Sequence, residues 1–521
     1  MPDSPDKKTA TLTIKTKVSG PEPVKKISGS IGQKTGARAH QRTRLQTEQK
    51  QAGTARSTES TQQPSEKAPT KGLRTPDKRT ARNPGARRPR PPSEVDQPHR
   101  HRPDLHGEAN KRMRTSHPLA MAAVPDLAES FHMFASCPRG LEAALAQELI
   151  GLGLKDVQSA QAGCRFRGNW SDVWRANLHS RLATRVLVQL AHGKIANEQD
   201  LRALAMNVEW ERWLGPEKTM RVDTSAIRSP MQSLQYCNLL VKDSVCDRLR
   251  EKEGARPSID TVRPDVRVHS FLAHDSATLY LDTSGESLFK RGWRLDKAEA
   301  PIRENLAAGL LAISGWHPSQ ALLDPFCGSG TILIEAAWMA LKIPPGINRP
   351  FAFERLRVHD KLQWQAMRQE ATAGIGNQLS APIVGSDLSA RAIEAAKLNM
   401  QRAGLAPGLI EWQVTDARTL TAPAESGVIV TNPPYGERLD IESGLMTAWA
   451  SQLKRAYAGW HVNVITADHN LPSAMRLQPR RRVPLFNGAL DCRVFMFDIV
   501  GSSYRPKERT RAAKKQQNDE T

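Results

Sequence analysis

The strongest constraint on the fold is an alternation of short apolar runs and helical patterns between residues 321 and 466. The predicted strands are Ala321–Asp324, Pro382–Asp387, Glu411–Val414, Gly427–Thr431 and His461–Thr466. Nearly continuous apolar strands separated by helices are typical of a parallel, doubly wound α/β sheet. After them, "RRRVPLFNGALDCRVFMFDIV" predicts a hairpin that turns at Asn487-Gly488, and therefore an antiparallel edge.

A second, α+β module is predicted before this sheet, from Phe131 to about Gly285. It begins with a short strand, a turn at Pro138-Arg139-Gly140 and an amphipathic helix. The expected apolar face and C-cap of that helix are Leu141, Leu145, Leu149, Ile150 and Gly151. Further on we expect a strand from Arg185, a helix over 234–249, and two strands from Val266 joined at His274-Asp275-Ser276.

A helix is also predicted between the two modules. Pro301 can occupy its first turn, and its apolar positions are Ile302, Leu306, Leu310 and Leu311.

The first 117 residues differ in composition from the rest of the chain. They contain no Phe, Tyr or Trp, and 26 Lys and Arg against 11 Asp and Glu, which accounts for most of the net charge of +21. Such a segment cannot bury enough apolar surface to offset its chain entropy, so a disordered basic arm is predicted. A polyphosphate partner suits this arm because neutralised phosphates release counterions, while a solvated tail without a partner is the plainer alternative.

Cysteine spacing and hydropathy narrow the class of protein. The six cysteines form no CxxC pair and no zinc-type cluster with histidine, so we expect reduced, unpaired thiols and no metal site. No apolar run approaches the roughly 20 residues that cross a bilayer, and no signal-peptide core is present. A cytoplasmic protein without a membrane association is the prediction.

The segment "DPFCGSGT" from Asp324 predicts a ligand cradle. Asp324 ends a strand, and Gly328, Ser329 and Gly330 let the backbone approach a ligand before a helix starts. In doubly wound sheets ligands bind beyond the carboxyl ends of strands. A Walker phosphate site is disfavoured because no Lys-Ser/Thr follows the glycines, and the spacing is not that of a dinucleotide fingerprint.

Two further acidic residues follow predicted strands. Asp387 can accept hydrogen bonds from both hydroxyls of a ribose, and its alternative role as a helix N-cap belongs better to Ser389. Asp416 can accept from an adenine amino group, although a role in a turn competes.

The tetrapeptide Asn432-Pro433-Pro434-Tyr435 predicts an acceptor platform for a planar amine. An exocyclic amine on a base is a poor nucleophile because its lone pair is delocalised into the ring. Hydrogen bonds to the Asn432 side-chain oxygen and the Pro433 carbonyl would favour a pyramidal nitrogen. Two prolines hold the backbone and remove amide donors, and Tyr435 would stack on the base.

Cys327 is the one candidate nucleophile. Its place inside the glycine turn favours a wall of the cofactor pocket over a covalent role of the kind used in C5-pyrimidine methylation.

At these residues the chain resembles class I S-adenosylmethionine-dependent methyltransferases, and more narrowly the bacterial THUMP-domain RNA methyltransferases that make N2-methylguanine in 23S rRNA. The resemblance covers roughly 131–500, and its motifs are "CPRGLE", "SGESLFKRGWR", "AEAPIRENLAAGLL", "DPFCGSGT", "TNPPYGERL" and "FNGALDCR". It implies a ferredoxin-like plus THUMP module that grips RNA and a Rossmann-like catalytic domain that binds S-adenosyl-L-methionine.

The resemblance also implies site residues. Asn432, Pro433, Pro434 and Tyr435 would receive the guanine amine, and the cofactor would lie against Asp324, Phe326, Gly328, Ser329, Gly330, Thr331, Asp387 and Asp416. Arg291, Trp293 and Arg294 lie in the linker motif of the family, where RNA or cofactor contacts and a structural hinge are equally good interpretations.

The resulting boundaries are a basic arm over 1–118, an RNA-binding module over 131–283, a methyltransferase domain over 284–500 and a polar tail over 504–521. Some members of the family carry a second methyltransferase domain, and we expect one activity here. The predicted partner is large-subunit rRNA or its precursor particle. The alternatives left open are a tRNA guanine-N2 methyltransferase, a DNA adenine-N6 methyltransferase and a non-catalytic ribosome-assembly protein.

Overall fold

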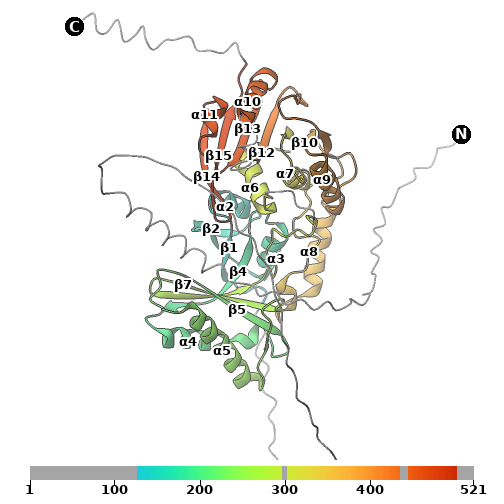
Figure 1. Ribbon diagram of the computed structural model, residues 1–521. Coiled ribbons are helices and arrows are strands. Elements are labelled where there is room, and N and C mark those ends of the chain that lie inside the picture. Colours follow the sequence, from blue (N-terminus) through green and yellow to red (C-terminus); the bar gives the residue numbers. More distant parts are fainter. Residues whose placement is uncertain (1–125, 296–301, 435–443, 502–521) are drawn as a thin grey trace, which may run out of the picture. The chain divides into compact units, whose positions relative to one another are not determined.

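The computed structural model describes residues 126–295, 302–434 and 444–501, and all of them belong to one compact unit, Asn110–Thr521. The predicted basic arm, Pro301, Tyr435 and the predicted polar tail lie outside these residues. The described residues form two sheets with helices packed on them (Figure 1). Among these helices, none is both long and apolar enough to cross a bilayer.

The first sheet has eight strands in the order β2-β3-β1-β4-β8-β7-β5-β6. Strands β4 and β8 join its two halves through an antiparallel ladder that runs from Leu187 opposite Asp282 to Lys194 opposite Ser276. The elements of this module are β1 Phe131–Ser136, α2 Glu142–Gly151, β2 Lys155–Ala160, β3 Gly163–Gly168, α3 Trp170–His179, β4 Arg185–Lys194, α4 Glu198–Asn207, η1 Trp210–Arg212, β5 Thr219–Ile227, α5 Leu234–Glu253, β6 Ser258–Ile259, β7 Val266–Ala273 and β8 Ser276–Asp282.

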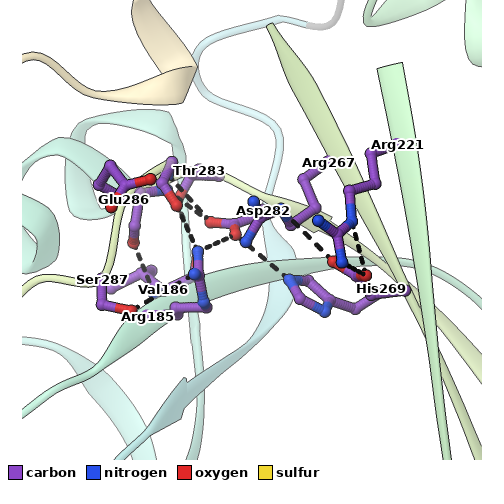
Figure 2. A network of polar contacts seen from close by, with 12 residues as sticks. Arg185, Val186, Arg221, Arg267, His269, Asp282, Thr283, Glu286 and Ser287 are labelled. Atoms are coloured by element: carbon purple, nitrogen blue, oxygen red, sulfur yellow. Dashed lines mark hydrogen bonds and ion pairs between the residues drawn. The ribbon is translucent and has the colours of Figure 1, made fainter. Parts of the chain in front are cut away.

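A polar network holds the point where the chain leaves β8 (Figure 2). The fully buried Asp282 carboxylate accepts from the Ser284 and Gly285 amides at 2.9 and 3.2 Å, pairs with Arg185, and lies 3.2 Å from His269 Nε2. Burial alone would raise the pKa of Asp282, but the hydrogen bond from His269 and the Arg185 charge hold it below its usual value. The carboxylate therefore stays ionised and fixes the start of the linker.

The second sheet has seven strands in the order β11-β10-β9-β12-β13-β15-β14. The first five are parallel, and β15 and β14 are antiparallel to their neighbours. The elements of this domain are α6 Glu304–Ser314, β9 Ala321–Asp324, α7 Thr331–Ala340, η2 Ala352–Arg355, α8 Lys361–Ala373, β10 Ile383–Asp387, α9 Ala390–Arg402, β11 Glu411–Val414, β12 Gly427–Thr431, α10 Leu445–Ala456, β13 His461–Thr466, α11 Leu471–Met475, β14 Arg481–Asn487 and β15 Leu490–Asp498.

Alternate residues of the central strands belong to two different cores. Leu322 and Val428 pack with α6 and α7, whereas their chain neighbours Leu323 and Ile429 pack with α10 and α11. Since successive side chains of a strand point to opposite faces, helices cover both faces of the sheet. The predicted doubly wound α/β domain with an antiparallel edge, preceded by an α+β module, is confirmed.

The five strands predicted in the second domain are confirmed, with one start shifted from Pro382 to Ile383. The hairpin turns at Asn487-Gly488, as predicted. The φ of +66° at Gly488 lies in the left-handed region, which favours glycine.

Two helix predictions were partly wrong. In α2, Ile150 is exposed and therefore not part of the apolar face. Gly151 is the last helical residue rather than the C-cap, and the positive φ after this helix is at Gly153. The helix expected from Pro301 begins only at Glu304, with Arg303 as its N-cap residue and Ile302 before it.

Candidate active site

The site forms where the order of the parallel strands reverses, between β9 and β12. Asp324 ends β9, Thr431 ends β12, and the Thr431 hydroxyl donates to Asp324 Oδ1 at 2.6 Å. The same oxygen accepts from the Phe326 amide at 3.1 Å. This switch point is where doubly wound sheets bind ligands, so Asp324 lies at the expected edge.

Asp324 is almost completely buried, and this governs its ionisation. Burial raises the pKa of its carboxyl to about 7, with the Asp387 charge adding to the rise and the hydrogen bonds from Thr431 and Phe326 opposing it. A cationic group beside Asp324 would favour the ionised form.

The glycine turn after β9 is attached to the neighbouring strand β10. The Cys327 amide donates to the Ser386 carbonyl at 2.9 Å, and the Gly328 amide donates to Asp387 Oδ2 at 2.9 Å. Asp387 therefore holds the glycine turn in place, whether or not it also binds a ligand. Each of its two oxygens accepts one amide, from Gly328 and Ser389, which leaves lone pairs for ribose hydroxyls. The N-cap of α9 is Ser389, as predicted.

Glycine at 330 is required by packing as well as by conformation. Its φ is +79°, and a Cβ there would lie 2.6 Å from the Trp412 ring and 3.0 Å from Ala396. The neighbouring Ser329 and Thr331 are buried, while Phe326 is partly exposed and packs edge-on against Trp449 at 5.2 Å between ring centroids. Close approach of a ligand is therefore not the only reason for the small residue at 330.

Asp416 is engaged by its own turn. Arg418 Nε lies 3.0 and 2.9 Å from the two carboxylate oxygens, Nη2 lies 2.5 Å from Oδ2, and the Arg418 amide donates to Oδ1 at 2.8 Å. The Arg418 guanidinium lowers the pKa of Asp416. The structure thus contains the turn that competed with the adenine role, and an adenine amine would have to share this carboxylate with Arg418.

The proposed amine platform directly follows β12. Asn432 and Pro434 are half-buried and Pro433 is buried. Among the residues that the structure describes, none is hydrogen-bonded to the Asn432 side chain. An amide with free acceptor capacity one residue beyond the Thr431–Asp324 contact fits the predicted acceptor role. Tyr435, the fourth predicted member, lies outside the described residues.

Cys327 fits the predicted wall better than a nucleophile. Its thiol is buried, and burial raises its pKa well above the ordinary value, with Asp324 and Asp387 adding to the rise. Since only the thiolate attacks, this environment opposes covalent catalysis. All six cysteines are buried and unpaired, as predicted.

The side chains of the linker residues are bound by other residues of the protein. The Arg291 and Glu335 side chains are fully buried and pair at 3.3 Å, and Arg291 also donates to the Leu288 and Arg181 carbonyls at 2.5 and 2.6 Å. Trp293 is buried against Trp338. Neither side chain has enough exposed surface to contact RNA.

Arg294 is bound in the same way. It holds Glu304 through two hydrogen bonds of 3.0 Å. The structural alternative for the linker therefore fits all three residues.

Some residues of the site were missed from the sequence. Thr431 bonds Asp324, the Ser386 carbonyl receives the glycine turn, and Trp412 packs on Gly330. Only Thr431 carried a signal, because it directly precedes Asn432 in the strand. The contacts of Ser386 and Trp412 follow from the pairing of β9, β10 and β11, which no local pattern reveals.

Three family models match consecutive parts of the chain. They are the RlmL ferredoxin-like domain at 132–187, the THUMP domain at 195–282 and the RMKL-like methyltransferase domain at 291–495. The chain therefore belongs to the THUMP-containing, S-adenosylmethionine-dependent class I methyltransferases with ferredoxin-like and RMKL-like domains.

Curated relatives of similar sequence include the protein named ribosomal RNA large subunit methyltransferase K/L of Shewanella baltica, 37% identical over 382 residues, which are 72% of this chain and 54% of the relative. The protein of the same name from Psychromonas ingrahamii is 38% identical over 69% of this chain and 49% of its own length. The chain thus spans about half the length of the curated relatives it matches.

Solved structures agree on the fold. A structure named as a predicted N6-adenine-specific DNA methylase from Listeria monocytogenes is 32% identical, with a TM-score of 0.65, over 71% of this chain and 96% of its own. SMU.472, named as a putative methyltransferase complexed with SAH, is 27% identical, with a TM-score of 0.65, over 72% of this chain and all of its own.

Proposed function

We propose that this chain binds S-adenosyl-L-methionine and methylates the exocyclic N2 amine of a guanine in RNA, with 23S rRNA as the target. The observation that carries the proposal is the pairing of Asp324 with Thr431, which sets the Asn432-Pro433-Pro434 segment beside the glycine turn at the switch point. The rRNA target is supported by the names of the curated relatives. The predicted domain boundaries and a cytoplasmic location are part of the same proposal.

The residues present fit the cofactor. Asp387 has free lone pairs on a carboxylate that is already positioned by two amides, and Asp324 supplies negative charge for a cationic amino-acid portion. Asp416 would take the adenine amine in competition with Arg418. When bound, S-adenosyl-L-methionine supplies an electrophilic methyl group on a sulfonium.

The protein then has to make the amine nucleophilic. The Asn432 side-chain oxygen and the Pro433 carbonyl accept the two amine hydrogens, so that the nitrogen lone pair leaves the ring and can attack the methyl carbon. With the cofactor bound, the methyl group would pass from its sulfur to this nitrogen, and the amine held by Asn432 and Pro433 would lose one proton to solvent. Tyr435 would stack on the base during this step.

Methylation of defined substrates tests the proposal. The purified chain is incubated with labelled cofactor and 23S rRNA, tRNA or duplex DNA, and the products are digested and identified by mass spectrometry. We expect N2-methylguanosine in 23S rRNA. N2-methylguanosine in tRNA alone would move the target to tRNA, and absence of product from every substrate would favour a non-catalytic role.

A second candidate is adenine-N6 methylation of DNA. Asn-Pro-Pro-Tyr chemistry serves any planar exocyclic amine, and the Listeria structure is named as a predicted N6-adenine-specific DNA methylase. The THUMP match supports RNA instead. Label found only in DNA, as N6-methyladenine, would decide for this candidate.

A further inference from the structure

A pocket of about 220 Å³ lies where three segments far apart in the sequence meet, with Thr184 from the start of β4 completing its lining. Its walls come from the turn before α2 with Arg139, the start of α6 with Arg303, and the tip of the β14–β15 hairpin with Phe486 and Asn487. These segments contain the motifs "CPRGLE", "PIREN" and "FNGALDCR", which the methyl-transfer chemistry does not use.

Both arginines of the pocket stack on aromatic rings. The Arg139 guanidinium carbon is 4.5 Å from the Phe486 ring centroid, and that of Arg303 is 5.1 Å from the Phe289 centroid. Stacking occupies the face of a guanidinium and leaves its N–H edge for an acceptor. Each arginine is thereby oriented without its donors being used up.

No acidic residue in the described part of the chain neutralises these arginines. Among the described residues, neither Arg139 nor Arg303 has an acidic partner, and both are exposed. Nearby Arg294 differs, since it is half-buried and bound by Glu304. Within 126–295, 302–434 and 444–501, no carboxylate lines the pocket, whose other polar side chains, Thr184 and Asn487, are neutral. The pocket is thus suited to an anion.

The walls are held in position before any ligand arrives. The Phe486 amide donates to the Arg139 carbonyl at 3.1 Å. Gly140, with φ of +96°, packs so closely that a Cβ would lie 2.4 Å from the Pro484 carbonyl oxygen. Asn305 Nδ2 donates to Thr184 Oγ1 at 3.1 Å. If the contacts of Arg139 served only to join the two domains, they would account for Arg139. They would not account for Arg303, which lies over the Phe289 ring without an acidic partner among the described residues.

We propose that this pocket binds a backbone phosphodiester of the RNA substrate. The proposal rests on the proposed function, because it assumes an RNA substrate, and it adds a binding site for the RNA backbone. Guanidinium groups bind phosphate oxygens in a bidentate manner, and phosphate contacts set the register of a bound nucleic acid. Because the pocket is built from the ferredoxin-like module and the catalytic domain, a phosphate held here positions the strand relative to both.

The test is RNA affinity as a function of salt for Arg139→Ala/Arg303→Ala, measured without cofactor on a 23S rRNA fragment. We expect the affinity to fall by about tenfold or more near 0.1 M salt. The dependence of log K on log salt should become shallower by about 0.7 to 0.9 for each phosphate that the variant no longer binds. Affinity for S-adenosylhomocysteine should stay at the level of the unchanged protein, which shows that the fold is intact.

Arg482→Ala is the matched control. Arg482 is exposed on β14 of the same hairpin, stacks on Phe495 at 5.8 Å and does not line the pocket. An equal fall in affinity in this control would mean general attraction to the basic surface and would overturn the proposal, as would an unchanged RNA affinity in the double variant. If the double variant fails to bind S-adenosylhomocysteine, the single variant Arg303→Gln is measured with the same two criteria.

Inorganic phosphate distinguishes a free anion from an RNA phosphodiester. If millimolar phosphate raises the thermal stability of the unchanged protein but not of the double variant, while both bind RNA equally, the pocket takes a small anion and the RNA assignment is wrong. Since RNA affinity is measured without methyl transfer, a protein that binds RNA through this pocket but methylates a different base would contradict only the proposed function.

Discussion

At the scale of single residues, Asp324 has the most informative environment. A carboxyl with a folded-state pKa of about 7, against an ordinary value of 3.8, is neutral in much of the ligand-free protein below neutral pH. A cationic ligand selects the ionised form. Binding of such a ligand and loss of the Asp324 proton are therefore linked.

The first prediction concerns this linkage. Affinity for S-adenosylhomocysteine should fall by up to about tenfold per pH unit below pH 7, because the ligand must first displace the proton, and should level off above it. Calorimetry in buffers of different ionisation enthalpy should show proton release on binding near pH 6 to about 7. An affinity that does not change over this range would mean that Asp324 stays neutral in the complex.

The same shift predicts the stability of the ligand-free protein. Because the folded-state pKa is raised, the folded state holds the proton more tightly than the unfolded chain, so stability is lost as pH rises from about 4 through 7. Asp324→Asn should remove this loss and make the protein more stable than the unchanged chain at pH 8 by about 1 to 4 kcal/mol. Urea unfolding at acidic and alkaline pH measures the free energy of unfolding of both proteins. If this free energy changes equally with pH in both, the prediction is contradicted.

Asn432 gives the third prediction. Asn432→Ala should lower turnover by about a thousandfold, since one acceptor for the amine is removed, while S-adenosylhomocysteine affinity changes little. Single-turnover methylation and calorimetry separate these effects. Asn399→Ala is no suitable control because Asn399 bonds the Ser329 carbonyl of the glycine turn. Asn377→Ala is suitable, because Asn377 is exposed and precedes β10, whose opposite end carries Asp387. Unchanged methylation would refute the acceptor role.

At the scale of elements, the linker between the sheets is held by buried charges. Arg291 pairs with Glu335 of α7 and bonds the Arg181 carbonyl, and Arg181 in turn donates to the Trp338 and Ile343 carbonyls at 3.1 and 2.7 Å. These contacts connect the first module to the catalytic domain. They explain why arginines in this motif are internal although arginine is normally an RNA-facing residue.

The fourth prediction follows from this burial. Arg291→Met should destabilise the protein by about 3–5 kcal/mol, because Glu335 is left buried without its partner. The double variant Arg291→Met/Glu335→Met should recover most of this stability, since two apolar side chains replace the pair. Urea unfolding measures both. A single variant that folds with normal stability but binds RNA weakly would restore the RNA-contact interpretation.

At the scale of the whole molecule, charge divides the chain. The first 117 residues carry 26 Lys and Arg against 11 Asp and Glu. Attraction of a polyanion by such a segment is salt-sensitive and independent of sequence. The contacts proposed for Arg139 and Arg303 would mainly fix the position of the bound RNA strand, and would contribute less to the overall affinity than the arm does.

The fifth prediction tests the arm. Removing residues 1–118 should weaken RNA binding and flatten its salt dependence, while methylation at saturating RNA persists. A full-length variant with the Lys and Arg of the arm replaced by Gln is the control, because it keeps length and removes charge. If truncation leaves RNA affinity unchanged, the arm serves another purpose.

The strand and helix pattern and the hairpin could be predicted from the sequence. These features depend on residues close together in the chain, where periodicity and turn chemistry decide the outcome. Asp324 and Asp387 could be predicted as strand-end carboxylates for the same reason, because the end of an apolar strand is a local signal.

Only the tertiary structure decided what these residues contact. The bond from Thr431 to Asp324 needs β12 to pair with β9, although 107 positions separate the two residues. Three other contacts likewise depend on how the chain packs. They are the buried ion pair of Arg291 with Glu335, the ion pair of Arg418 with Asp416, and the contact of Arg139 with the Phe486 ring. The sequence by itself determined which residues could do chemistry, because that depends on side-chain type. Packing determined which of them are free to do it, because burial and partners are set by residues distant in the chain.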